Sequence, residues 1–169
     1  MKKLLAVLVL VLATQVSVAE YNTYYGFRGG MSMRQAMANA EAMGAVLADQ
    51  ADIPAAHIAV YNGGRMQRVM LTTTILFFDR ESKTLISVAF TPTAWESMPT
   101  LESANERVRA EAISFGQAAK LQPDYWYDDD GTLNARFYVN GMKVHISAMT
   151  DKGEFALGLF IFFKEGKNT

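Results

Sequence analysis

The chain of 169 residues has two histidines, whose side chains are the best suited to proton transfer near neutral pH. His145 lies in a segment of alternating polar and apolar residues, where it could act as a general base. No motif marks a nucleophile or an orienting carboxylate for it, so we favour a hydrogen-bonded histidine on a strand. The chain has no cysteine and no HExxH spacing, which argues against thiolate chemistry and a zinc site. We therefore assign no catalytic residue, metal or cofactor.

Three consecutive acids, Asp128, Asp129 and Asp130, precede Gly131 and raise the question of calcium binding. A calcium loop places acids at alternating positions and adds a bidentate glutamate further along the chain. Here the acids are contiguous, and no glutamate follows at that spacing. We expect a solvated turn, and we keep its three carboxylates as candidates for contact with a partner protein.

The pair Asn140-Gly141 is a strong signal for a two-residue hairpin, because both positions of such a turn accept positive φ angles. The turn sets the register of the strands on either side, so that one face gathers apolar residues and the other gathers polar ones. The apolar pairs are Val139 with Met142, Phe137 with Val144, Ala135 with Ile146 and Leu133 with Ala148. The polar face carries our candidate binding residues, Arg136, Tyr138, Lys143 and His145.

The last strand, residues 155–163, is apolar at nearly every position and does not alternate. A strand that is apolar on both faces is usually central, with both faces covered. Residues 75–78 have the same character and belong to a predicted hairpin of 69–78 with 84–91. We expect both apolar runs in the middle of one sheet, as candidate neighbours.

Two segments have apolar residues at the spacing of an amphipathic helix. The first stripe predicts a helix over 33–51, with Ser32 as its cap and an end before Pro54. The second stripe predicts a helix over about 101–119, for which Thr100 and Ser103 are alternative caps.

These elements predict an α+β fold in which two amphipathic helices pack on an antiparallel, meander-type sheet of about six strands. Residues 77–82 and 126–131 share a pattern of two aromatics, an aspartate, a polar residue, an acid and a small residue. Each run is followed by Thr-Leu and a strand, and each comes after a capped helix. The pattern is compatible with two helix-plus-hairpin halves, arising either by duplication or by convergence.

Residues 1–19 have the parts of a secretory signal peptide. Lys2 and Lys3 precede ten residues that are all Leu, Val or Ala, and the small residues Ser17 and Ala19 follow. The apolar run is about half the length of a membrane-spanning helix. We expect cleavage after Ala19, export to a bacterial periplasm or to the medium, and a single domain over 20–169.

The composition excludes several classes of function. Hydrophobic residues make up 50% of the chain, which is too many for a disordered protein. The formal net charge is -1, and loss of Lys2 and Lys3 with the signal leaves 14 basic against 17 acidic residues, a net of -3. A nucleic-acid binder carries a basic excess, so we expect no nucleic-acid partner and no stable membrane insertion after cleavage.

The function predicted from these patterns is a non-enzymatic protein-interaction module of the cell envelope. One specific form is an immunity or inhibitor protein whose acids 128–130 enter the basic active site of a toxin or hydrolase; another is an envelope accessory protein. The first alternative is a carrier of a small apolar ligand, with a cleft between sheet and helices beside strand 155–163. The second alternative is a hydrolase that uses His145 as its base.

Overall fold

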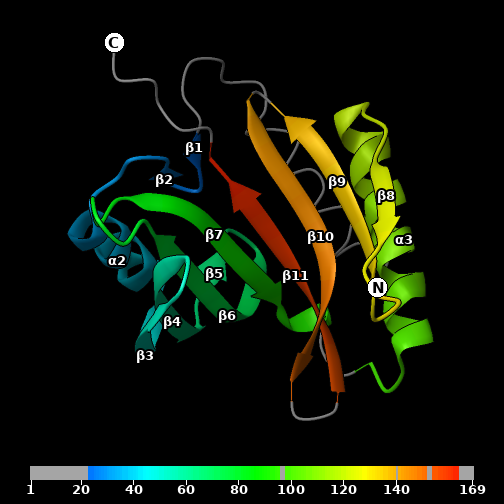
Figure 1. The fold of residues 1–169 in the computed structure, drawn as a ribbon, viewed down its shortest axis with the longest axis horizontal. Coiled ribbons are helices and arrows are strands. Elements are labelled where there is room, and N and C mark those ends of the chain that lie inside the picture. Colours follow the sequence, from blue (N-terminus) through cyan, green and yellow to red (C-terminus); the bar gives the residue numbers. More distant parts are fainter. Residues whose placement is uncertain (1–22, 96–97, 140, 152–153, 164–169) are drawn as a thin grey trace.

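The computed structural model describes residues 23–95, 98–139, 141–151 and 154–163 as an α+β fold with two helices and a nine-stranded antiparallel sheet (Figure 1). The sheet has the order β3-β4-β6-β7-β11-β10-β9-β8, and the short β5 pairs with β6. Its strands are β3 (Ala45–Ile53), β4 (Ala56–Gly63), β5 (Arg65–Met66), β6 (Val69–Phe78), β7 (Leu85–Pro92), β8 (Asp124–Tyr127), β9 (Leu133–Val139), β10 (Met142–Asp151) and β11 (Glu154–Phe162). The other elements are the paired strands β1 (Thr23–Tyr24) and β2 (Phe27–Arg28), helices α2 (Met33–Ala42) and α3 (Leu101–Ala119), and the 3₁₀ turn η1 (Thr93–Trp95).

The sheet consists of two meanders that meet at its centre. In the first half, α2 precedes β3, β4, β6 and β7, and in the second half α3 precedes β8, β9, β10 and β11. The last strand of each half, β7 and β11, pair with each other, so the first strand of each half lies at an edge. The predicted antiparallel α+β class is confirmed, but each half is a helix followed by a four-stranded meander, and the sheet exceeds the six strands expected.

The largest difference from the prediction is the helix over 33–51. The helix ends at Ala42, and Gly44 follows with a φ of 80°, a conformation that a glycine adopts without steric cost. Residues 45–53 form the edge strand β3, which pairs with β4 along its length. The apolar spacing in this segment does not mark a buried helical face, since Leu47 lies on the strand and is 38% exposed. Hairpin pairing with β4, which follows after a two-residue turn, outweighed the weak local helical preference.

The helix predicted over 101–119 is confirmed as α3, and Thr100 is its N-cap. The Thr100 hydroxyl accepts a hydrogen bond from the Ser103 backbone N–H, and the Ser103 hydroxyl accepts one from the Thr100 backbone N–H. This reciprocal capping box satisfies two donors that the first turn leaves free. At the start of α2, Ser32 caps in the predicted way by accepting from the Gln35 backbone N–H.

Both predicted hairpins form, and the register of the second is the one that its turn implied. The β9–β10 pairs run from Val139 with Met142 to Asn134 with Ser147, and β6 pairs with β7. The last strand, β11, is central, as predicted, but it does not contact β6. Strand β7 lies between the two apolar runs that were candidate neighbours.

The described helices cover one face of the sheet. Helix α3 contacts β9, β10 and β11, with the rings of Phe115 and Phe137 4.5 Å apart, and α2 contacts β3 and β6. Strand β2 adds Phe27, whose ring lies 6.0 Å from that of Phe90. The side chains of both helices and of the facing strands form one continuous buried core. Among the residues that the structure describes, neither helix is long and apolar enough to cross a membrane.

The two faces of β11 differ in burial, whereas both were expected to be covered. Leu157, Leu159 and Ile161 are fully buried beneath the helices. Phe160 and Phe162 point to the opposite face and are half-buried. Neighbouring side chains on the same face shield them in part, which explains how a strand in the middle of the sheet tolerates phenylalanine there.

Candidate functional site

The four residues predicted from the Asn-Gly hairpin lie together on the sheet face opposite the helices. Lys143 pairs directly with Tyr138, and His145 pairs directly with Arg136. Side chains that are directly opposite in an antiparallel pair share a face and lie within contact distance. Tyr138 is 61% exposed, while the other three side chains are partly buried. The predicted grouping is therefore present as a continuous surface of two strands.

Two aromatic residues from neighbouring strands complete this surface. Strand β8 places Trp126 beside Asn134, and β11 places Phe162 opposite Lys143. We call the whole set the cation–aromatic cluster, and its members are Trp126, Arg136, Tyr138, Lys143, His145 and Phe162. It spans four adjacent strands, from β8 at the sheet edge to β11 at the centre.

Arg136 is the best-oriented charge of the cluster. Its guanidinium carbon lies 5.3 Å from the ring centroid of Trp126 and 5.5 Å from that of Tyr138. Its Nη2 atom is 3.4 Å from the carboxylate of Asp124, which is 61% exposed. Stacking on aromatic faces holds the planar guanidinium in place, while its Nε atom is buried without a hydrogen-bond partner among the described residues. Arg136 can therefore present its remaining N–H donors to a carboxylate from outside.

Lys143 is the second cation, and it rests on an aromatic ring. Its Nζ atom lies 4.6 Å from the centroid of Phe162. No carboxylate of the described residues lies within ion-pair distance of this ammonium. The ammonium therefore makes a cation–π contact with the ring, and the Lys143 side chain is half-buried.

His145 lies between aromatic rings and cations. Its ring is 5.3 Å from Trp126 and 4.9 Å from Phe162. Burial, and then the positive charges of Lys143 and Arg136, lower the pKa of His145 to about 4. The imidazole is therefore neutral at physiological pH, and its buried Nε2 has no hydrogen-bond partner among the described residues. Because that nitrogen is buried, His145 contributes to the surface as a neutral ring packed between Trp126 and Phe162.

The acidic turn after β8 supports the cluster through Trp126. Asp128 accepts a hydrogen bond from the Trp126 indole N–H at 3.0 Å and another from the Asn134 amide at 2.9 Å. Asp130 accepts from the Thr132 backbone N–H, and this hydrogen bond lowers its pKa. All three acids are exposed. Two of them hold the turn and the indole in position, which leaves Asp129 as the carboxylate directed to solvent.

The sequence predicted four of the six cluster residues and missed Trp126 and Phe162. The sequence shows that Phe160 and Phe162 lie on the same face of the last strand, but it does not show which strand pairs with that strand. Trp126 required knowledge that β8 pairs with β9. Within the described residues, no group of three side chains could hold a metal ion.

Searches against protein-family models, curated proteins and solved structures found no match for this chain.

Proposed function

We propose that the protein is a non-enzymatic interaction module that recognises another protein through the sheet face opposite its helices. The observation that supports this most directly is the cation–aromatic cluster, in which Arg136 is held between Trp126 and Tyr138 and keeps 36% of its side chain exposed. Trp, Tyr and Arg are the residue types that contribute most often to the energetic centre of protein interfaces. A rigid aromatic support lowers the entropy lost when a partner binds the cation.

The chemistry of the cluster favours an acidic partner surface. Arg136 and Lys143 are diagonal neighbours on the adjacent strands β9 and β10, and aromatic rings on the same face support both. A partner carboxylate beside Arg136 would compete with the exposed Asp124, whose contact with Arg136 is long at 3.4 Å. Charged pairs at the edge of such an interface act mainly on association rate and specificity.

The proposal includes export of the chain. The charged, apolar and small-residue order of residues 1–19 supports a signal peptide cleaved after Ala19. The mature protein would then act in the periplasm or outside the cell, without cofactor or metal. The mass of the protein recovered from the periplasmic fraction tests this: a chain that begins at residue 20 is expected, and an intact chain in the cytosol would contradict it.

A narrower form of the proposal is the immunity or inhibitor role, supported by the exposed carboxylate of Asp129 at the tip of the β8–β9 turn. Asp129→Lys would then weaken capture of a basic partner, whereas the same change would leave capture through the sheet face intact.

The main test compares partner capture by two variants with the same change in charge. The mature chain, its Arg136→Glu/Lys143→Glu variant and an Arg34→Glu/Arg68→Glu control are each used to capture proteins from an envelope extract. Arg34 and Arg68 are exposed and lie outside the cluster. We expect one protein, captured by the mature chain and by the control, to be lost from the cluster variant. Equal capture by all three would refute the sheet face as the binding surface.

A further inference from the structure

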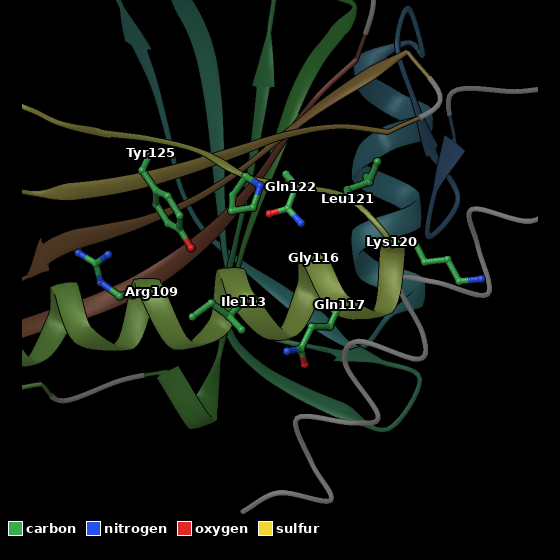
Figure 2. Close-up of a pocket in the computed structure, with 9 residues that line it drawn as sticks. Arg109, Ile113, Gly116, Gln117, Lys120, Leu121, Gln122 and Tyr125 are labelled. Carbon is green, nitrogen blue, oxygen red and sulfur yellow. The ribbon is translucent and has the colours of Figure 1, made fainter.

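A groove lies at the sheet edge, on the face of the sheet that the helices cover, between the outer surface of α3 and strand β8. Figure 2 shows Tyr125 facing Arg109 across it, with Ile113 on the helix between Arg109 and Gly116. The main cavity has a volume of about 530 Å³, and a second one of about 380 Å³ continues it past Arg109 toward the start of the helix. Tyr125 and Tyr127 share the face of β8 that is directed toward α3, because they pair with the core residues Ala135 and Leu133.

Arg109 is oriented toward the groove before any ligand binds. Its guanidinium carbon is 5.7 Å from the ring centroid of Tyr125, and its Nη2 atom donates a hydrogen bond to the Tyr127 hydroxyl at 3.2 Å. None of the ion pairs found among the described residues involves it. A fixed guanidinium with unused N–H donors matches the geometry of a carboxylate.

The groove also exposes apolar surface. Ile113 is 48% exposed, Tyr125 is 39% exposed and Tyr127 is 59% exposed. These three are among the seven large hydrophobic residues that the described surface exposes. An exposed apolar patch with polar groups at its rim is typical of a contact site.

Strand β8 adds a backbone edge to this site. It is the last strand in the sheet order, and within the described residues it pairs with β9 only. An extended peptide can add to such an edge by main-chain hydrogen bonds, while alternate side chains of the peptide enter adjacent pockets. The groove lies on the side that every second side chain of an added strand would face.

The charged residues of α3 differ between the two ends of the groove. Glu102 and Glu106 line the smaller cavity, Lys120 lines the larger one, and Arg109 lies between them and lines both. Arg109 and Lys120 are separated by about 16 Å along the helix. Two side chains four residues apart on an extended chain are separated by about 13 Å, and the length of the lysine side chain covers the remainder. Acidic side chains would therefore be attracted to the larger cavity and repelled from the smaller.

We infer that the groove between α3 and β8 binds an extended acidic segment of another protein, added as a strand to the edge of β8. One acid of the segment pairs with Arg109. An apolar side chain two residues away contacts Ile113 and Tyr125, and a second acid two residues beyond that approaches Lys120. The occupant is a peptide and not a compact ligand, because β8 offers a backbone edge and the cations Arg109 and Lys120 are separated along the length of the groove.

The test uses the mature protein and a seven-residue peptide with blocked ends, glutamate at positions two and six, leucine at position four, and threonine elsewhere. A peptide of the same composition with adjacent glutamates is the control for sequence. A peptide with lysine in place of both glutamates is the control for charge. NMR titration of the ¹⁵N-labelled protein identifies the residues that bind, and the concentration dependence gives the affinity.

We expect the designed peptide to shift the amide signals of β8 and of α3 near Ile113, and to bind more tightly than both control peptides. Arg109→Ala should weaken binding about tenfold or more, since it removes a charge-assisted pair. Arg34→Ala, a matched change at an exposed position of α2 outside both sites, should leave the affinity within about twofold. Ile113→Glu, at an exposed position, gives a second variant that should lose binding by repulsion without unfolding the protein.

Absence of binding, shifts confined to the cation–aromatic cluster, or equal affinity after Arg109→Ala would each overturn the inference. Those outcomes leave the proposed role of the sheet face standing, because that role is tested by variants at Arg136 and Lys143 in a separate experiment.

Discussion

A buried ion pair within α3 allows a quantitative test of how much stability is lost when a buried charge of this fold loses its partner. The Arg107 Nε atom lies 2.7 Å from the Glu111 carboxylate, one helical turn away. Glu111 is only 3% exposed, whereas Arg107 is 35% exposed at the rim. Trp95, itself 3% exposed in η1, also hydrogen-bonds to Glu111. Burial raises the pKa of Glu111, and the charge and hydrogen bond of Arg107 and the Trp95 hydrogen bond oppose that rise.

Arg107→Ala should destabilise the protein by about 3 kcal/mol at pH 8, the lower end of the range for breaking a buried ion pair. The lower end applies because water can reach the rim position that the guanidinium vacates. The cost should shrink as the pH falls, because the folded-state pKa of Glu111 lies above its unfolded value and rises further without Arg107. Protonation of Glu111 thus stabilises the fold, and this contribution is lost as the pH rises through the folded-state pKa.

The assay is urea denaturation at pH 5 and pH 8, followed by tryptophan fluorescence, for the single variants and the double variant. Glu111→Gln is the control. It keeps an acceptor for Trp95 and leaves Arg107 to solvent, so it should lower the free energy of unfolding by about 1 kcal/mol or less. Arg107→Ala/Glu111→Gln should recover most of what Arg107→Ala loses at pH 8. An equal cost of Arg107→Ala at both pH values, or no recovery in the double variant, would refute this account.

Two further predictions concern single positions. His145 should titrate with a midpoint near 4 in NMR spectra, because burial and the charges of Lys143 and Arg136 oppose its protonation; a midpoint above 6 would contradict this. Gly116→Ala should destabilise the protein by about 1–3 kcal/mol in denaturation experiments, although alanine favours a helix. Its Cβ atom would lie 2.7 Å from the Leu121 backbone oxygen, so a neutral or stabilising result would show that the end of α3 moves freely.

The parts of the fold that were predicted correctly are those whose cause lies within a few residues. The Asn-Gly turn determined the register from Val139–Met142 onward, and with it the face that carries Arg136 and Lys143. The start of α3 was located to within three residues, with Ser103 and Thr100 as alternative caps, because a cap needs only a side chain and a backbone donor three residues away; the structure has Thr100 as the cap. These are local interactions, and distant chain segments did not change them.

The parts that were predicted wrongly depend on which segments meet in space. Residues 45–53 have helical spacing in isolation, yet they form β3 because β4 offers a partner along their whole length. The two apolar runs of β6 and β11 do not touch, because each half places its last strand at the seam and β7 therefore separates them. No pattern within either run contains that information.

By itself the sequence determined the antiparallel α+β class, the start of each helix, and the alternation that places four cluster residues on one face of a hairpin. Only the tertiary structure decided that Trp126 and Phe162 join them, and that Arg109 meets Tyr125 and Tyr127 across a groove. The physical reason is the range of the forces involved. Turn geometry, capping and strand alternation act between near neighbours, whereas strand order and helix placement follow from burying one continuous apolar core.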